Sequence, residues 1–176
     1  MTERLHFHFG KYRTKLHTLT LPSPPTPLAS YIPATRADNF IYVSGQLPIS
    51  GDYMPTGRVP DVVSKEAATD ASVTCFLNVL AAALPLLHEN ETLKLLQLQG
   101  FVQSAPDFYE QPSVIDGAST LAVQLLEENG KHARIAVGVN ALPKNAPVEI
   151  SCTFLVVPSK IRFLGRYRWF DKKSLK

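Results

Sequence analysis

Apolar side chains repeat with helical spacing in two segments of the chain. The first segment follows Asp61 and Ser64, either of which is a suitable N-cap. Its apolar positions are Ala67, Ala71, Cys75, Phe76, Val79, Leu80 and Ala83. The second segment begins at Gln111-Pro112 and ends at Gly130. Its apolar positions are Val114, Ala118, Leu121, Ala122, Leu125 and Leu126. Each predicted helix therefore has one apolar face that packs on a sheet.

Alternating or continuous apolar runs bounded by turn residues predict five strands. They cover residues 29–36, 40–47, 93–102, 134–139 and 148–157. The first two are joined by the Asp38-Asn39 turn and predict a β-hairpin. The element order ββαβαββ predicts an α+β fold in which two helices pack on one face of a mixed sheet. The other face needs a different cover, for which another subunit is a candidate.

The proline-rich run from Leu21 to Pro27 contains four prolines and cannot pair in a central strand. It separates a basic N-terminal arm, residues 1–20, from the domain proper, residues 21–157. A basic, aromatic-rich tail, residues 158–176, follows. A chain of 176 residues, 45% of them hydrophobic, is expected to form one core.

The longest apolar region of the chain, residues 73–87, is interrupted by Thr74, Asn78 and Pro85. It falls short of the roughly 18 unbroken apolar residues that a spanning helix requires, so no membrane span is predicted. The only two cysteines, Cys75 and Cys152, stand in no metal-binding spacing. Neither a disulfide framework nor a metal site is expected, and a cytoplasmic, reducing compartment fits best.

The net charge of +3 is divided unevenly along the chain. Residues 1–20 carry four basic side chains and one acidic, and residues 159–176 carry seven and one. Subtracting these ends from the total leaves −6 on residues 21–158. Basic ends on an acidic body favour docking of the ends on the protein itself, or plain solvation, over nucleic acid binding.

Two motifs resemble those of a known family. Residues 39–48 form a strand that ends in Ser-Gly-Gln-Leu-Pro, and a second segment runs from Arg134 through Leu142-Pro143 to Glu149. Together they resemble the reactive intermediate deaminase family, also called RidA, YjgF or L-PSP, over roughly residues 21–157. The resemblance implies a chorismate-mutase-like fold, a homotrimer whose sheets form a central barrel, and ligand clefts between subunits.

The same resemblance implies roles for Arg134 and Glu149. An arginine presents a planar fork that grips a carboxylate bidentately, and in the family this arginine holds the substrate carboxylate. A carboxylate at the start of an apolar strand is suited to position or deprotonate water. The plainer alternatives are a surface arginine at a strand edge and a glutamate that faces outward or pairs with Lys144. The fifteen-residue spacing is the one expected of deaminating members.

Four further residues are candidates for substrate binding. Ser44 and Gly45 offer a hydroxyl and a close backbone approach, although such a pair often marks a plain turn. Tyr31 falls where the family places an aromatic residue, but most strand tyrosines simply pack. Phe108 is the fourth candidate, and its alternative is a place in the core.

These residues predict cofactor-free hydrolysis of 2-imino or enamino acids to 2-keto acids and ammonia. Ile135-Ala136 stand where many deaminating relatives carry Ser or Cys, and residues 100–108 resemble a sub-branch of mostly unassigned activity.

A module that binds a small carboxylate or a protein partner without catalysis is the first alternative. RNA binding or cleavage through the basic ends is the second. A mitochondrial transit peptide in residues 1–20 is the alternative to a cytoplasmic location.

Overall fold

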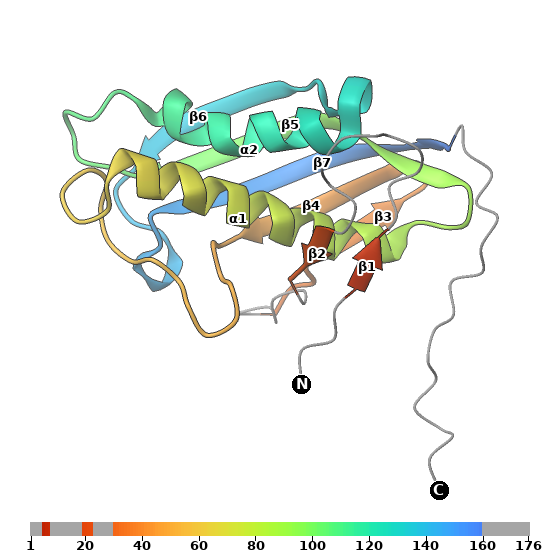
Figure 1. Ribbon diagram of the computed structural model, residues 1–176, viewed down its shortest axis with the longest axis horizontal. Coiled ribbons are helices and arrows are strands. Elements are labelled where there is room, and N and C mark those ends of the chain that lie inside the picture. The colour runs from red at the N-terminus through yellow and green to blue at the C-terminus, as the bar shows by residue number, and fades with distance from the viewer. Residues whose placement is uncertain (1–4, 8–18, 23–29, 160–176) are drawn as a thin grey trace, which may run out of the picture.

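The computed structural model of the protein describes residues 5–7, 19–22 and 30–159. Two short strands, β1 and β2, pair antiparallel in a sheet of their own. The other strands form one five-stranded sheet, which two α-helices cover (Figure 1). The strands are β1 Leu5–Phe7, β2 Leu19–Leu21, β3 Ala34–Ala37, β4 Phe40–Gln46, β5 Glu91–Gln103, β6 Ala133–Val139 and β7 Val148–Pro158. The helices are α1 Lys65–Ala83 and α2 Gln111–Leu126, with 3₁₀ helices η1 Leu84–Leu86, η2 Glu127–Gly130 and η3 Pro143–Asn145.

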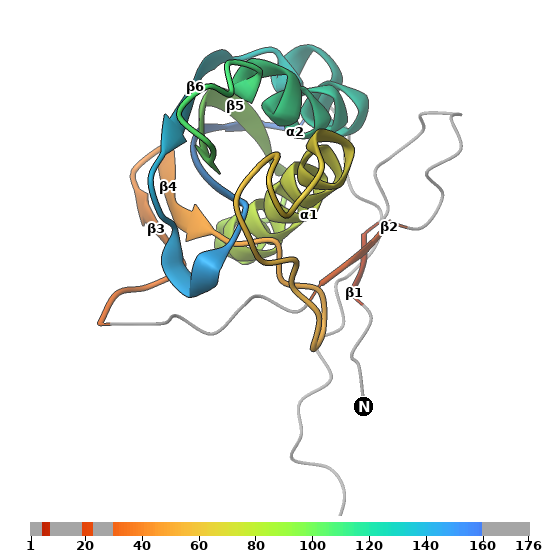
Figure 2. The same cartoon turned by 90° about the vertical axis from the view of Figure 1, so that its left-hand side faces the viewer.

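The main sheet has the strand order β3-β4-β7-β5-β6. Only β5 and β6 pair in parallel, and α2 supplies the crossover that a parallel pair requires. The other neighbours are antiparallel. Both helices lie side by side on one face of the sheet, as the two views show (Figures 1 and 2). The predicted α+β fold with two helices on one face is confirmed.

Helix α1 is the central core helix. Ser64 caps it as predicted, because its side chain accepts a hydrogen bond of 3.1 Å from the Ala67 amide. Ala67 itself is exposed, and the buried stripe begins at Ala68 instead. By length and hydropathy the segment 65–86 is apolar enough to cross a membrane, but 61% of its apolar window is buried. That burial is typical of a core helix, whose side chains are apolar because they pack inside the protein.

The core lies between the helices and one face of the sheet. Helix α2 comes close to β5 because Gly100 has no side chain, and a β-carbon there would lie 2.6 Å from the Ile115 side chain. Residues that are completely buried line both layers. Among the largest are Phe76, Val79 and Leu80 on α1, Ile115 on α2, and Ile41, Leu95, Leu98, Ile150 and Phe154 on the sheet.

The first strand of the domain is shorter than predicted, since β3 begins at Ala34 rather than at residue 29. Pro33 precedes it and lacks the amide donor that a paired strand residue needs. Leu21, at the end of β2, is 4% exposed and belongs to the hydrophobic core. Most of the basic arm, and residues 160–176 of the basic tail, lie outside the described residues.

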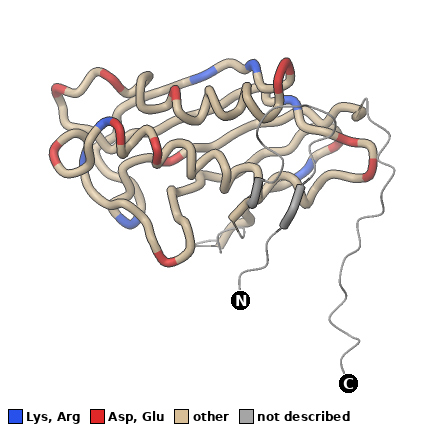
Figure 3. Tube along the Cα trace, viewed as in Figure 1, with Lys and Arg blue, Asp and Glu red and all other residues tan. Residues whose placement is uncertain are grey.

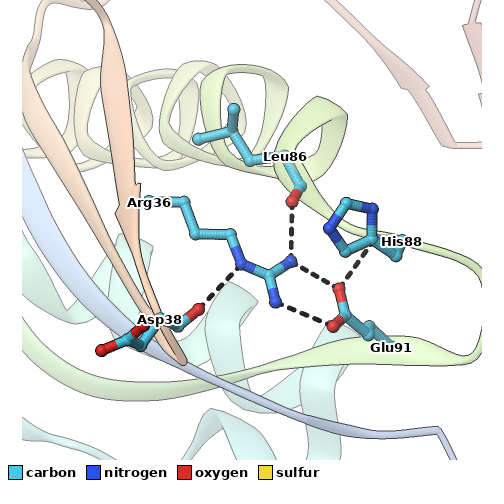
Figure 4. Close-up of polar contacts among 5 residues, drawn as sticks. All are labelled: Arg36, Asp38, Leu86, His88 and Glu91. Atoms are coloured by element: carbon cyan, nitrogen blue, oxygen red, sulfur yellow. Dashed lines mark hydrogen bonds and ion pairs between the residues drawn. The ribbon is translucent and has the colours of Figure 1, made fainter.

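Edge strand β3 is anchored by Arg36, whose guanidinium is bonded on all three nitrogens (Figure 4). It pairs bidentately with Glu91 at 2.6 and 2.8 Å, and it also donates to the carbonyl oxygens of Leu86 and Asp38. Glu91 accepts a further hydrogen bond from the His88 amide. The paired guanidinium lowers the pKa of Glu91 to about 2. Every nitrogen of this guanidinium already has a partner within the chain, so Arg36 acts as a structural clamp.

Candidate functional site

The sheet face opposite the helices carries a row of exposed apolar side chains, referred to below as the open face. Phe40 and Tyr42 on β4 are 40% and 49% exposed, and their rings stack with centroids 6.4 Å apart. Ile135 and Val137 on edge strand β6 are 43% and 40% exposed. The two groups lie on strands that β7 and β5 separate, and Phe101 of β5 is in register with Val137 on one side and with Glu149 on the other.

Glu149 lies on this open face, since it is in register with Phe101. Its carboxylate sits over Gly45, so closely that a β-carbon at that position would overlap Oε1 and lie 2.7 Å from Cδ. The side chain is partly buried, and this desolvation raises the pKa of Glu149. Within the described residues no hydrogen bond or ion pair reaches the carboxylate, and Lys144 is not its partner. Glu149 thus has a partly desolvated carboxylate that makes no hydrogen bond or ion pair within the described residues.

Ser44 ties the segment that carries Tyr31 to the end of β4. Its hydroxyl donates to the Ile32 carbonyl at 2.8 Å, and its amide donates to the Pro33 carbonyl at 2.9 Å. Tyr31 is 44% exposed beside this anchored residue. The register of β4 against β7 shifts between Val43 and Gln46, which is a local irregularity of the kind that re-aims side chains. The structure therefore gathers Tyr31, Ser44, Gly45 and Glu149 in one region.

Arg134 lies on the other face of the sheet. It is in register with Leu98, which is completely buried beneath the helices. Its Nη1 donates to Asp116 Oδ1 at 2.6 Å and to Ser119 Oγ at 3.2 Å, and both partners belong to α2. Strand β5 also separates β6 from β7, which carries Glu149. One chain by itself does not bring Arg134 and Glu149 together.

Phe108 does not belong to this group. It is 7% exposed and packs in the hydrophobic core. The loop that carries it is drawn inward, because the Ala105 amide donates to the Val59 carbonyl at 2.8 Å. The role of a ligand contact, one of its two sequence interpretations, is not supported by this packing, which matches the alternative of a core aromatic.

Sequence reasoning missed three polar residues around Arg134. Asp116 and Ser119 face it from α2, and His132 lies two residues before it. His132 Nε2 lies 3.1 Å from Ser119 Oγ, and its Nδ1 lies 2.6 Å from the Gly130 carbonyl oxygen. The signal was available in the spacing, since residues three apart share a helix face and residues two apart share a strand face.

Neither metal nor thiol chemistry finds support in the described part of the chain. No cluster of three His, Cys, Asp or Glu side chains there is arranged to hold a metal ion. Cys75 and Cys152 are free and buried. Burial raises the pKa of both thiols, which keeps them protonated and poorly nucleophilic.

The sheet order, the two covering helices and the residues at the end of β4 define an α+β protein of the YjgF-like class. The model of the endoribonuclease L-PSP family matches residues 22–156. The chain therefore belongs to this family, also known as the RidA or YjgF family. The match spans both motifs on which the resemblance was based.

Three relatives match most of this chain and most of their own length. Protein TCP17 of Trypanosoma cruzi is 35% identical over 136 residues, 75% of this chain and 84% of that protein. Protein MMF1, mitochondrial, of Saccharomyces cerevisiae is 30% identical over 138 residues, 78% of this chain and 82% of that protein. The crystal structure of Atu1372 from Agrobacterium tumefaciens, a protein of unknown function, is 41% identical with a TM-score of 0.70. The match covers 79% of this chain and 87% of the Atu1372 chain.

One relative with a named activity matches over a short stretch. The 3-aminoacrylate deaminase RutC of Acinetobacter baylyi is 68% identical over 25 residues. These residues make up 14% of this chain and 20% of RutC. The similarity is strong but local.

Proposed function

We propose that the protein hydrolyses reactive 2-imino and enamino acids to 2-keto acids and ammonia, at a site formed between subunits. The observation that carries this proposal is the Glu149 carboxylate, which is partly buried and lies over Gly45 with no hydrogen-bond or ion-pair partner among the residues that the structure describes. A desolvated carboxylate with a raised pKa is a stronger base toward water than an exposed one. Family membership and the local match to an aminoacrylate deaminase support the same reaction class.

The active assembly in this proposal is a homotrimer whose subunits bury their open faces against one another in a central barrel. Four apolar side chains on that face, Phe40, Tyr42, Ile135 and Val137, are each 40–49% exposed in one chain. Large apolar side chains exposed together on one face of a sheet mark an interface more often than a free surface. The family resemblance supplies the threefold arrangement.

The assembly would also unite the two halves of the site. Arg134 and Glu149 lie on opposite faces of the same sheet, with β5 between their strands. In the proposed trimer Arg134 of one subunit meets Glu149 of the next. Gly45 and Ser44 accompany Glu149, because they lie at the adjacent end of β4. A small carboxylate-bearing substrate would bind between the two subunits.

The proposed reaction needs three events. Arg134 binds the substrate carboxylate through Nε and Nη2, because its contacts within the described residues use Nη1 alone. Glu149 takes a proton from water, whose oxygen bonds to C2 while the C=N electron pair moves to nitrogen, and Glu149 passes that proton to the nitrogen to give a carbinolamine. Glu149 then takes the proton of the carbinolamine hydroxyl as the C=O bond forms and the C–N bond breaks, and it gives this proton to the nitrogen, which leaves as ammonia. One such acid or base contributes about 10²–10⁴-fold to the rate.

The proposal is tested by following ammonia and keto-acid release from imino acids that an amino-acid oxidase generates in the assay. The wild-type protein should accelerate release, and Arg134→Ala should abolish the acceleration. Arg58→Ala is the matched control, because within the described residues the Arg58 side chain makes only a solvent-exposed 3.5 Å contact with Asn140. If several imines are not accelerated while a small carboxylate still binds, the protein is a non-catalytic binding module.

An RNA-directed function ranks below deamination. Residues 30–159 carry seven basic and thirteen acidic side chains. The basic ones are scattered over the described fold (Figure 3). Phosphate binding calls for a positive surface. The basic tail on which an RNA role would depend lies outside the described residues apart from Pro158 and Ser159. RNA binding that is lost on deletion of residues 159–176 would reverse this order.

Two cellular locations are open in this proposal, the cytoplasm and the mitochondrion. The yeast relative MMF1 is named as mitochondrial, which makes a mitochondrial location a reasonable alternative to a cytoplasmic one. Cell fractionation of the full chain and of a chain lacking residues 1–20 distinguishes them. Loss of mitochondrial recovery on deletion would assign a targeting role to the arm.

A further inference from the structure

Four polar side chains form a continuous hydrogen-bonded network between α2 and the start of β6. Asp116 and Ser119 are three residues apart on one face of α2. His132 directly precedes β6, and Arg134 is the second residue of that strand. The two pairs face each other across the packing of the helix on the strand. Arg134 Nη1 contacts both helix residues, and Ser119 continues the network to His132.

The network has a fixed direction. A guanidinium only donates, so Ser119 Oγ accepts from Arg134 at 3.2 Å. A carbonyl oxygen only accepts, so His132 Nδ1 carries the proton that it shares with Gly130 at 2.6 Å. Neutral His132 then has its lone pair on Nε2, which accepts the Ser119 hydroxyl proton at 3.1 Å. Every donor along this path meets an acceptor.

Arg134 differs in this respect from Arg36, the other arginine that a carboxylate holds within the described residues. Arg36 spends Nε, Nη1 and Nη2 on partners within its own chain. Arg134 spends only Nη1 within the described residues, and its side chain is 25% exposed. The network thus holds one corner of the guanidinium and leaves the Nε–Nη2 edge, the bidentate edge for a carboxylate, uncommitted.

We infer that Ser119 and His132 are positioning residues that set the orientation of Arg134 for carboxylate binding. This inference rests on the proposed function and deepens it. Asp116 supplies the counter-charge, but its side chain is 63% exposed, so the ion pair alone restrains the arginine weakly. The Ser119 hydroxyl fixes the rotation of the guanidinium, and His132 fixes the hydroxyl. A long arginine side chain otherwise loses rotamer entropy when it binds a ligand.

Three variants separate positioning from a merely structural role. Ser119→Ala removes the hydroxyl, whereas Ser119→Thr keeps it and serves as the conservative control. His132→Asn keeps a side-chain N–H for the Gly130 carbonyl but removes the acceptor for Ser119. The loss of one such hydrogen bond should weaken pyruvate binding, measured by titration calorimetry, about fivefold in Ser119→Ala and in His132→Asn. Combining the two changes should add little, because both break the same link.

In imine hydrolysis the same two variants should raise KM about fivefold and leave kcat within about twofold, because the carboxylate does not react. In the wild type, nitrogen-15 NMR should show that the neutral imidazole of His132 carries its proton on Nδ1. Unchanged pyruvate affinity in Ser119→Ala, or a His132→Asn variant that behaves as wild type, would overturn the inference.

Different results would refute the proposed reaction and the positioning role. A wild type that binds pyruvate through the network but hydrolyses no imine refutes the proposed reaction and keeps the positioning role. A wild type that hydrolyses imines with an indifferent Ser119→Ala variant refutes positioning and keeps the reaction. A wild type that binds no pyruvate refutes the positioning role, since Arg134 then presents no carboxylate site.

Discussion

Gly45 lies directly beneath the carboxylate of Glu149, and no other amino acid fits there without moving that carboxylate. A β-carbon at Gly45 would overlap Glu149 Oε1. The obstruction is the far end of a flexible side chain rather than backbone, so the fold can yield by turning the glutamate aside. The glycine is thus a requirement of the site more than of the fold.

Gly45→Ala is therefore expected to damage activity and spare stability. Displacing the base by about 1 Å should lower kcat for imine hydrolysis by roughly 10²-fold. The free energy of unfolding, measured in urea, should change by less than about 1 kcal/mol, because no core contact is lost. A variant with wild-type kcat would show that the position of Glu149 does not matter.

Glu149→Gln should remove the base and lower kcat by about 10²–10⁴-fold. Desolvation raises the pKa of Glu149 above its ordinary value, so the acid limb of the wild-type rate profile should also lie above that value. The control is Glu128→Gln, since that carboxylate is 83% exposed. An unchanged kcat in Glu149→Gln would exclude Glu149 as the base.

The stability of Glu149→Gln follows from the sign of the same shift. A carboxyl with a raised pKa binds protons more readily when folded, so the wild type loses stability as pH rises from the unfolded to the folded pKa. The variant should be at least as stable as the wild type at pH 7. This advantage should vanish at pH values below the unfolded pKa, which thermal melts across pH would measure.

Glu91→Gln should have the opposite pH signature. Its bidentate pairing with Arg36 depresses the pKa of Glu91 to about 2, so the pair contributes stability above the unfolded pKa and loses it as pH falls toward 2. The variant should melt roughly 2–4 °C below wild type at pH 7, and the two should converge near pH 2. Glu110→Gln, which breaks the more exposed pair with Lys65, should have a smaller effect.

The open face is tested by Val137→Glu against Val123→Glu. Val137 on β6 is 40% exposed and Val123 on α2 is 41% exposed, but only Val137 lies on the proposed interface. A buried charge opposes association, so Val137→Glu should sediment as a single 19.4 kDa chain. Val123→Glu should remain at three times that mass. A trimeric Val137→Glu protein would rule out this face as the interface.

Periodicity predicted the fold well because both helices and the strands of the sheet each bury one face. The predicted strands 134–139 and 148–157 begin and end within a residue or two of the observed strands β6 and β7. Strand β3 begins at Ala34, later than predicted, and the residue before it is Pro33, which has no amide hydrogen to donate. Ala67 was misplaced by one position, because a stripe of alanines is a weak guide to helix phase.

The candidate site was only partly legible in the sequence. Ser44, Gly45 and Glu149 belong to two separate sequence motifs, and they lie near one another because β4 pairs with β7. The separation of Arg134 from Glu149 was not predictable, since it depends on β5 inserting between two strands that are neighbours in the chain. Ser119 belongs to a helix that only the fold brings against Arg134.

Subunit complementation tests the central claim most directly. Arg134→Ala and Glu149→Gln trimers, each inactive alone, are mixed in equal amounts, unfolded and refolded together, and assayed for imine hydrolysis. If each site takes Arg134 from one subunit and Glu149 from the next, random assembly should restore roughly a quarter of the sites. Recovery near that level is the predicted result. No recovery, from mixed trimers verified by mass spectrometry, would contradict a site shared between subunits.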